Sequence, residues 1–199
     1  LLSRRQRQMC IRDRFGASDT AIIMGRWDTE TFRRWWLQKI GIRKEHFTTP
    51  AMQAGTAYEH RILSAIGVRT MDKQIRIRRY RLRVNYDGEF PDTIIEVKTY
   101  GKPVFKVSKA YWQQCQVEMF ASGYGFWRHR KRCNIVAYRL TEAEMQNYFL
   151  AVDTRRLSSH EVQYDECWVR DAYLPRLRYL ARCLRTGHWP SMEEFYATG

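Results

Sequence analysis

One stretch near the middle of the chain contains two runs that each predict a β-strand, with a turn between them. Leu82 to Tyr86 alternates apolar and polar side chains, which is typical of a half-buried strand. Asp87-Gly88 is expected to end this strand, because Gly88 and Pro91 both favour a turn. Thr93 to Thr99 is a β-branched run that favours a second strand. If the two strands pair as a hairpin, Asp87 lies beside Glu96.

This hairpin would gather charged side chains that can bind a metal. Glu96 and Lys98 are two residues apart and point to the same face, while Val97 points into the core and leaves its carbonyl at the strand edge. The carboxylates of Asp87 and Glu96 suit Mg²⁺ or Mn²⁺. A lysine beside the ion can orient or deprotonate a water, or neutralise charge in a phosphoryl transition state. The spacing D-x8-E-x-K is that of PD-(D/E)xK nucleases, but a solvated charged strand face gives the same pattern.

The composition favours a one-domain protein with a polyanionic partner. A chain of 199 residues, 44% of them hydrophobic, can bury a substantial core. The net charge of +14 suits nucleic acid first, although a basic solvated surface would also account for it. No run approaches the roughly 18 apolar residues of a membrane span, and no apolar signal-peptide core follows the basic start. We therefore expect a cytoplasmic protein.

Neither the cysteines nor the histidines indicate a zinc or iron–sulfur site. The five cysteines are scattered and lack a CxxC spacing, so reduced and mostly buried thiols are expected. His60 is expected to be a helix-surface residue. No Gly-rich phosphate loop is found, which excludes an ATP-driven motor.

Residues 1–14 are expected to form a basic arm outside the fold. They contain five arginines and one aspartate and show no periodicity. The run RQRQMCIRDR also resembles a translated sequencing adapter, and under this alternative interpretation the native protein begins near Phe15. Residues 15–199 are expected to form a single domain, because no linker or internal repeat divides them.

Hydrophobic periodicity and capping residues predict the remaining elements. The expected helices span residues 18–24, 29–40, 50–66, 108–121 and 158–186, the last one kinked or split at Pro175. The expected strands span residues 74–79, 82–86, 93–99, 133–140 and 148–152. Residues 127–132 read as a basic turn that could contact phosphate. Ile40 and Met52 are expected to pack in the core.

Several polar residues of these elements have two interpretations each. Ser18 is either the N-cap of its helix or a phosphate ligand at the helix N-terminus. Glu59 follows Gly55 by one helical turn and is either a surface carboxylate or a metal ligand. Arg76 and Arg78 share one face of a strand and meet either DNA phosphates or water. Five residues of the helix after the hairpin fall at helical spacing: Tyr111, Gln114, Cys115, Glu118 and Met119.

The order of these motifs resembles the YqaJ-type viral recombinase (lambda exonuclease) family of PD-(D/E)xK nucleases. The resemblance covers roughly residues 15–140. Its matching segments, in order, are Gly16 to Ala21, Gly55 to Glu59, Asp87-Gly88, Glu96 to Lys98 and Tyr111 to Gln116. The chain departs from the family pattern at Tyr86, where proline or serine is usual. Asp92 follows Pro91 and imitates the family motif, but it is interpreted as a turn residue.

The resemblance implies an α/β fold with a restriction-endonuclease-like core, in which helices flank both faces of a mixed central β-sheet. It also implies a catalytic centre. Asp87, Glu96 and the Val97 carbonyl would hold Mg²⁺ or Mn²⁺, two ions in all. Glu59 would complete the metal site from its helix, and Lys98 would position the attacking water.

The helix after the hairpin and the chain start carry further implied roles. Tyr111 and Gln114 would lie beside the scissile phosphate. Ser18 would line a pocket for a 5′-terminal phosphate, and an arginine usually accompanies that serine. Arg12 and Arg14 are the candidates for it.

The implied activity is 5′→3′ digestion of linear double-stranded DNA ends by metal-activated water in phage-type recombination. The family also implies a ring homo-oligomer (a trimer) and a single-strand annealing partner. A RecB-like or CRISPR-associated single-strand nuclease, a junction resolvase and a non-catalytic DNA-binding module remain as alternatives. The absence of a four-cysteine cluster counts against several of the nuclease branches.

Overall fold

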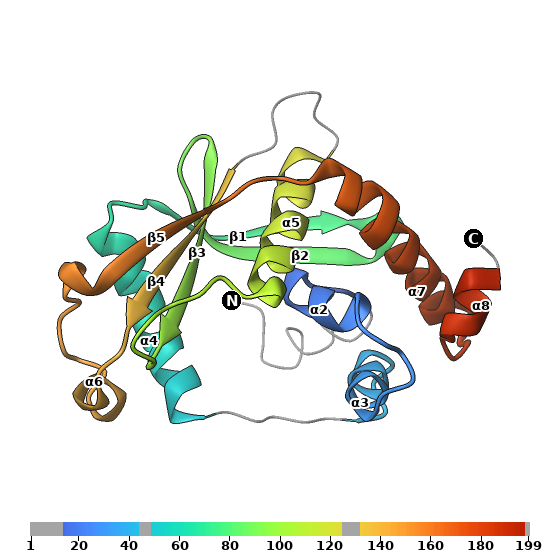
Figure 1. Cartoon of the computed structure of the whole chain (residues 1–199), viewed down its shortest axis with the longest axis horizontal. Coiled ribbons are helices and arrows are strands. Elements are labelled where there is room, and N and C mark those ends of the chain that lie inside the picture. The colour runs from blue at the N-terminus through green and yellow to red at the C-terminus, as the bar shows by residue number, and fades with distance from the viewer. Residues whose placement is uncertain (1–13, 44–48, 125–131, 198–199) are drawn as a thin grey trace.

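The computed structural model describes residues 14–43, 49–124 and 132–197, and a five-stranded sheet forms its centre (Figure 1). The strand order is β1-β2-β3-β4-β5. Strands β3 and β4 are parallel, and the other neighbours are antiparallel. The strands are β1 (Thr70–Ile77), β2 (Leu82–Glu89), β3 (Thr93–Tyr100), β4 (Arg132–Arg139) and β5 (Leu157–Val162).

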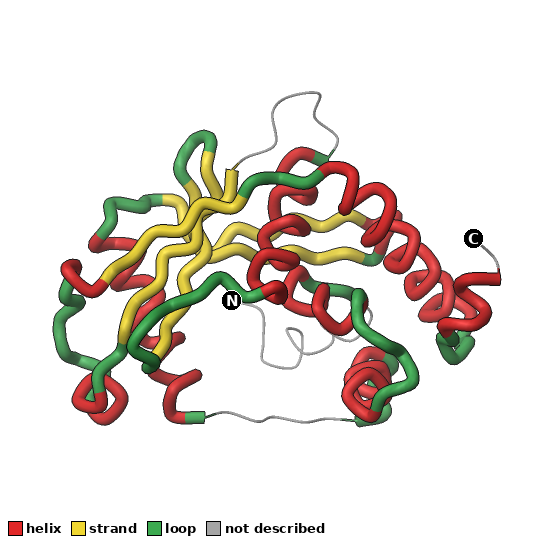
Figure 2. Tube along the Cα trace, in the orientation of Figure 1, coloured by secondary structure: helices red, strands yellow, loops and turns green. Residues whose placement is uncertain are grey.

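The helical elements connect and cover these strands (Figure 2). Before the sheet come η1 (Ala17–Asp19), α2 (Thr20–Ile23), α3 (Glu30–Lys39) and α4 (Pro50–Ala65). Between strands lie η2 (Arg78–Tyr80), α5 (Lys109–Gly123), α6 (Glu142–Gln146) and η3 (Thr154–Arg156). After the sheet come a π-helical turn η4 (Trp168–Tyr173), α7 (Leu174–Thr186) and α8 (Met192–Ala197). No helix among the described residues has the length and apolarity needed to cross a membrane.

Helices pack on both faces of the sheet because β3 alternates apolar side chains between two cores. Ile94 joins a cluster that includes residues of α5 and α7, whereas Ile95 and Val97 join a second cluster with Tyr58 and Leu63 of α4. In Figure 1, α5 lies in front of the sheet and α4 lies behind it. The mixed sheet with helices on both faces is the expected α/β fold, and this prediction is confirmed.

Strands β2 and β3 pair only over a short distance. The register joins Gly88 to Ile95 and Glu89 to Ile94, and beyond these pairs the strands diverge. Phe15 occupies the edge of β2 that β3 leaves: it forms a parallel bridge with Leu82, and its carbonyl accepts a hydrogen bond from the Arg83 N–H at 2.8 Å. The start of the described chain therefore lies in the angle between the two strands.

Glycine 88 does not end β2, which corrects the expected turn. The strand continues to Glu89. A Cβ at Gly88 would lie 2.7 Å from Val68 Cγ1 and 3.0 Å from Leu63 Cδ2. The glycine is therefore explained by the close packing of the segment around α4 on the strand, and not by a turn conformation.

The second half of the chain corrects two further expectations. Residues 148–152 are not a strand, because their backbone is held from α4: Tyr58 Oη donates to the Leu150 carbonyl at 3.0 Å, and Arg61 donates to the carbonyls of Tyr148 and Leu150. The strand at the β4 edge is instead Leu157–Val162, part of which was expected to be helical. The C-terminal helix begins after this strand. A break at Pro175 was expected, and Pro175 lies in the first turn of α7, directly after the π-helical turn η4.

Two expected core residues are exposed. Ile40 follows α3 and is 39% exposed, and Met52 in the first turn of α4 is 55% exposed. Both lie at helix ends, beyond the part of the helix that contacts the rest of the fold. The basic turn expected over residues 127–132 lies outside the described residues except for Arg132, which begins β4.

Candidate active site

A hydrogen-bonded cluster of charged and amide side chains lies between β3 and α5. Lys98 Nζ donates to Glu96 Oε1 at 2.5 Å and to Gln114 Oε1 at 3.3 Å. Gln114 Nε2 donates to the same Glu96 oxygen at 2.5 Å. Glu96 is only 3% exposed. The shared face predicted for Glu96 and Lys98 is thus the face that α5 covers.

Asp87 lies beside this cluster at the point where β2 and β3 separate. Its Oδ2 accepts a hydrogen bond from the Val97 N–H at 2.7 Å. Burial, followed by repulsion from Glu96 and Glu59, raises the pKa of Asp87 to about 8. The hairpin therefore brings Asp87 next to Glu96, as the turn between the strands predicts.

Glu59 approaches the same carboxylates from α4. Burial and then the charge of Glu96 raise its pKa above the ordinary value. Gly55, one turn earlier, lets α4 come close to β3, because a Cβ there would lie 2.8 Å from Thr99 Oγ1. His60 is on the helix surface, as expected, and its Nε2 lies 3.0 Å from Asp72 Oδ2.

The carboxylates of Glu59, Asp87 and Glu96 are ligands of the kind that a divalent cation binds. Asp87 Oδ2 and Glu96 Oε1 accept hydrogen bonds from the protein. Glu96 Oε2 is buried and has no hydrogen-bond partner among the described residues. Buried polar atoms normally have a partner, so a cation bound at this oxygen would satisfy it. In the described part of the chain, two sets of three side chains bring their ligand atoms within 4.8 Å of one another: Glu59–His60–Asp72 and Cys115–Glu118–Cys133. Glu59, Asp87 and Glu96 do not form such a set.

Glu118 is a member of the cluster that the sequence analysis did not assign to the site. Its Oε1 accepts a hydrogen bond from Gln114 Nε2 at 2.8 Å, and the residue is fully buried. Burial, and then the charge of Glu96, raises the pKa of this carboxyl well above its ordinary value. The available signal was its position four residues after Gln114, which puts both on one helix face.

Tyr111 contacts the cluster through its ring. Lys98 Nζ lies 5.1 Å from the ring centroid, a cation–π distance. Phe105 also contacts this ring, and the two rings are stacked with centroids 6.0 Å apart. Tyr111 and Gln114 therefore both contact Lys98 from α5, whereas Gln116 points away and bonds to Gln163 and Asp165.

A cleft of about 290 Å³ adjoins the cluster at Gln114. The residues that line it include Arg14, Ser18, Arg83 and Asn85. The expected capping role of Ser18 is wrong, because Ser18 lies inside η1 and the N-cap residue is Gly16. The Gly16 N–H donates to Asp19 Oδ2 at 2.7 Å, and Ser18 is exposed. Arg12 lies outside the described residues.

The basic side chains that line this cleft differ in whether an acidic residue already pairs with them. Lys39 also lines it but forms a largely buried ion pair with Asp19 at 2.5 Å. The Arg83 side chain has no ion-pair partner among residues that the structure describes. Arg83 and Asn85 were not expected to line a binding cleft. The available signal was that they are the polar positions of the alternating run that predicted β2.

The two strand arginines lie in different elements. Arg76 is on β1 and pairs in register with Arg83, the cleft residue, and its Nε donates to Gln74 Oε1 at 2.6 Å. Arg78 follows the end of β1 and belongs to η2, so the strand ends at Ile77, two residues earlier than expected. Both side chains are exposed.

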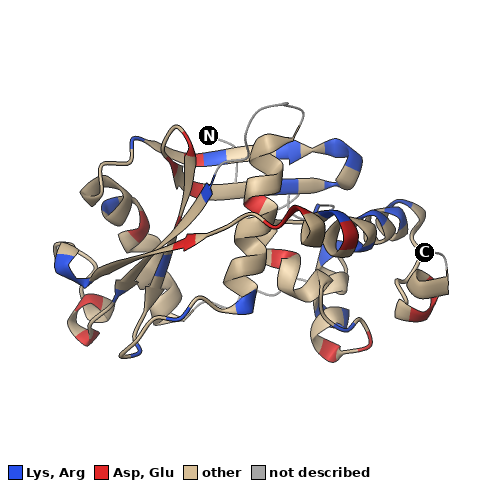
Figure 3. Ribbon diagram, turned by 45° about the horizontal axis from the view of Figure 1, so that its top comes forward, with Lys and Arg blue, Asp and Glu red and all other residues tan. Residues whose placement is uncertain are grey.

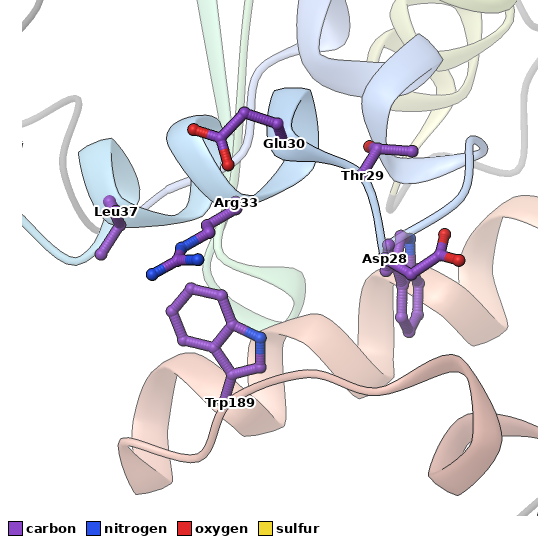
Figure 4. A pocket seen from close by; sticks show the side chains of 7 residues that line it. Asp28, Thr29, Glu30, Arg33, Leu37 and Trp189 are labelled. Carbon is purple, nitrogen blue, oxygen red and sulfur yellow. The ribbon is translucent and has the colours of Figure 1, made fainter.

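A hollow of about 440 Å³ lies apart from this cluster, between the start of α3 and the segment before α8. Arg33 and Leu37 of α3 face Trp189 across it, and Asp28 lies at its far end (Figure 4). It shares no lining residue with the Ser18 cleft. Its position excludes it as part of the candidate active site.

Comparison with known proteins identifies the fold. No family model and no curated protein sequence matches the chain. The alkaline exonuclease LHK-Exo from Laribacter hongkongensis superposes with a TM-score of 0.63 at 17% identity, over 96% of this chain and 95% of that one. A phage-related exonuclease from Haemophilus somnus 129PT gives a TM-score of 0.63 at 14% identity, over 91% of this chain and 99% of that one.

A complex of LHK-Exo with dAMP gives the same TM-score of 0.63 at 16% identity, over 90% of this chain and 91% of that one. The fold implied by the resemblance to the YqaJ-type family is thus found in solved exonuclease structures over nearly the whole chain. The chain has the fold of the phage-type alkaline exonucleases.

Proposed function

We propose that the chain is a metal-dependent deoxyribonuclease that digests linear double-stranded DNA from its ends. The observation that carries this proposal is the cluster of Asp87, Glu96 and Lys98, with Glu59 beside it and one buried Glu96 oxygen without a partner. Four carboxyl groups gather around one lysine there when Glu118 is included. A divalent cation would relieve the repulsion that raises the pKa values of Asp87 and Glu59.

Glu59, Asp87, Glu96 and the Val97 carbonyl are the groups proposed to hold Mg²⁺ or Mn²⁺, two ions in all. When bound, such ions lower the pKa of a water and stabilise the charge of the leaving 3′-oxygen. Burial lowers the pKa of Lys98, but the Glu96 carboxylate raises it more, so the pKa lies above its ordinary value. Lys98 therefore stays charged and acts as a hydrogen-bond donor that orients the attacking water, and not as its base.

The neighbouring cleft is proposed to bind the 5′-terminal phosphate. Ser18 offers an exposed hydroxyl there, and Arg14 and Arg83 supply positive charge. Because Gln114 lines both the cleft and the catalytic cluster, a terminal phosphate in the cleft would lie next to the carboxylates. This arrangement supports cleavage in the 5′→3′ direction.

Basic side chains along the fold are proposed to hold the duplex without sequence preference. Lys and Arg residues are distributed along the β1–β2 hairpin, where Arg76 and Arg78 lie, and along α7 (Figure 3). Such contacts make binding strongly dependent on salt concentration. The phage recombination setting, the annealing partner and the trimeric ring rest on the resemblance alone, and the cytoplasmic location is a proposal from the sequence.

The first experiment incubates the protein with Mg²⁺ and three DNAs: linear duplex with a 5′-phosphate, linear duplex with a 5′-hydroxyl, and a closed circle. We expect loss of the phosphorylated linear duplex alone. Asp87→Ala should abolish it. Asp92→Ala is the matched control, because Asp92 is exposed on the turn, where its carboxylate accepts hydrogen bonds from Arg132 at 3.0 Å and from Thr93 at 3.1 Å.

The other outcomes separate the alternative functions. Cleavage of the circle would indicate an endonuclease or resolvase, and preference for a single strand would indicate a RecB-like enzyme. Retained DNA binding without cleavage of any substrate would indicate a non-catalytic module. Equal rates of digestion of the two linear duplexes would contradict the proposed role of Ser18 in binding the 5′-phosphate.

A further inference from the structure

A second hollow adjoins the catalytic cluster, between the end of β3 and the start of α5. It has a volume of about 780 Å³ and is lined by residues 100–106, Ser108 and Tyr111; we call it the β3–α5 groove. This volume lies in the range of small-molecule sites, so the groove has room for a nucleotide. None of the roles proposed above uses it.

Aromatic rings connect the groove to the catalytic lysine. The Phe105 ring lies 5.2 Å from the Tyr100 ring and 6.0 Å from the Tyr111 ring, to which it is nearly parallel at 8°. Tyr111 in turn contacts Lys98 at 5.1 Å. The groove therefore reaches the cluster at Tyr111, whereas the Ser18 cleft reaches it at Gln114.

The groove is basic and carries an exposed apolar side chain. The sequence holds no Asp or Glu between Glu96 and Glu118, but it holds four lysines there. Lys102 and Lys106 line the groove, are exposed, and have no ion-pair partner in the part of the chain that the structure describes. Val104 is 66% exposed at the same place. Their charges are available to an anionic ligand.

We propose that the β3–α5 groove binds an unpaired segment of the DNA strand that is being cut. Aromatic rings and an apolar side chain interact with the faces of bases, which a duplex hides within its stack. Phe105 and Val104 would contact the bases, and Lys102 and Lys106 would contact the phosphates. With a terminal phosphate in the Ser18 cleft and the scissile phosphate at Lys98, the groove takes the nucleotides that follow.

This inference rests on the proposed nuclease function, and binding without cleavage tests it separately. Fluorescence anisotropy would measure the affinity for a labelled single-stranded oligothymidylate in buffer with Ca²⁺ in place of Mg²⁺. Phe105→Leu keeps an apolar side chain against Tyr111 but removes the stacking surface, so we expect about fivefold or more weaker binding. Lys102→Ala/Lys106→Ala should weaken binding and lower the salt dependence by about one to two phosphate contacts.

The matched control is Arg26→Ala/Arg34→Ala, which removes two exposed basic residues whose charges are paired with Asp28 and Glu30. It should bind the oligonucleotide as the wild type does. Thermal unfolding of every variant shows whether the fold is intact. With Mg²⁺, the groove variants should raise KM for duplex ends more than they lower kcat, because the carboxylate cluster is unchanged.

Wild-type affinity in all groove variants would overturn the groove proposal and leave the nuclease proposal intact. Altered sedimentation of the groove variants with unchanged oligonucleotide binding would overturn it too, since the groove would then be an interface between copies of the chain. Oligonucleotide binding that depends on the groove in a protein without any nuclease activity would support the groove and contradict the proposed function.

Discussion

Lys98 contacts a carboxylate, an amide and an aromatic ring, and each contact limits what it can do. Its hydrogen bonds to Glu96 and Gln114 fix the ammonium group over the catalytic cluster. The raised pKa keeps it protonated. Because the lysine is not a phosphate clamp on an open surface, its contribution belongs to the chemical step and not to DNA binding.

Lys98→Ala should therefore keep DNA affinity and lower kcat by about a hundredfold or more, which is the effect of removing one preorganised donor. Gel-shift binding with Ca²⁺ and single-turnover cleavage with Mg²⁺ measure the two quantities. Lys73→Ala serves as the control. Lys73 Nζ forms a similar ion pair with Glu89 Oε1 at 2.6 Å, and this pair is not part of the catalytic cluster. Comparable losses of binding and cleavage in Lys98→Ala would contradict this role.

Glu118 should act through Gln114. Glu118→Gln keeps a hydrogen-bonding side chain of the same shape and should change kcat by less than about threefold, since burial already favours the uncharged form of the wild-type carboxyl. Glu118→Ala leaves Gln114 without its 2.8 Å partner and should lower kcat by about tenfold at unchanged KM. A large loss in Glu118→Gln would instead indicate that the carboxylate itself takes part.

At the scale of elements, the site depends on how closely α4 packs against the sheet. Both Gly88 of β2 and Gly55 of α4 lie where a Cβ would meet a neighbouring side chain at less than 3 Å. Gly88 belongs to the short pairing with β3 and follows Asp87, while Gly55 precedes Glu59 by one turn. The two glycines therefore set the positions of two of the predicted metal ligands.

Gly88→Ala should destabilise the protein by about 1–3 kcal/mol, the usual effect of overpacking, and should lower activity because Asp87 is displaced. Denaturant unfolding would measure the loss of stability, and cleavage of linear duplex with Mg²⁺ would measure the loss of activity. Gly101→Ala is the matched control, since a Cβ at Gly101 would meet nothing within 4 Å. Equal stability of the two variants would show that α4 can move without cost.

Glu144 ties together three elements on another part of the sheet. It accepts hydrogen bonds from Tyr138 of β4, Thr141 at the start of α6 and Arg156 of η3. Burial raises its pKa, but the Arg156 hydrogen bond and the others outweigh burial and lower it to about 2. Its contribution to stability is present above the unfolded pKa and is lost as the pH falls toward 2.

Glu144→Ala should cost about 3–5 kcal/mol of stability, because it leaves the Arg156 guanidinium partly buried without its partner. Denaturant unfolding at neutral pH measures this loss. Nuclease activity of the protein that remains folded should be unchanged, since Glu144 is not part of the catalytic cluster. Activity lost in proportion greater than the folded fraction would contradict that separation.

At the scale of the whole molecule, the carboxylate cluster couples stability to pH and to metal. In the folded protein the pKa of Asp87 is about 8, above its unfolded value, and that of Glu59 is raised as well. The folded state therefore holds these protons more tightly. Stability from this source is present at pH 4 and is lost as the pH rises toward 8, by about 1.4 kcal/mol per unit of pKa difference.

The metal-free protein should accordingly unfold at a lower temperature at pH 8 than at pH 5, and Mg²⁺ should raise the unfolding temperature more at pH 8. Calorimetry in EDTA and in Mg²⁺ measures this difference. Asp87→Asn should reduce the pH dependence, with Glu59 and Glu118 contributing the rest, and Asp92→Asn should leave it unchanged. A metal-free protein whose stability is constant between pH 5 and pH 8 would contradict the cluster's electrostatics.

Patterns within short segments were enough to predict much of the fold. The periods of two and of about 3.6 residues located β3, α4 and α5, and Ser108 was correctly expected to cap α5, where its Oγ accepts from the Tyr111 N–H. The same periods put Glu96 with Lys98 and Tyr111 with Gln114. These relations are local, because the geometry of one strand or one helix settles them.

Contacts between distant segments decided the rest. Leu157–Val162 contains two serines and a histidine and is a poor strand former, but the open edge of β4 pairs with it, whereas α4 holds residues 148–150 by their carbonyls. Phe15 brings Ser18 to Arg83 because β3 turns away from β2 there. The sequence by itself determined which side chains share a face; the tertiary structure determined which faces meet, because strand pairing and helix docking depend on partners that no single segment contains.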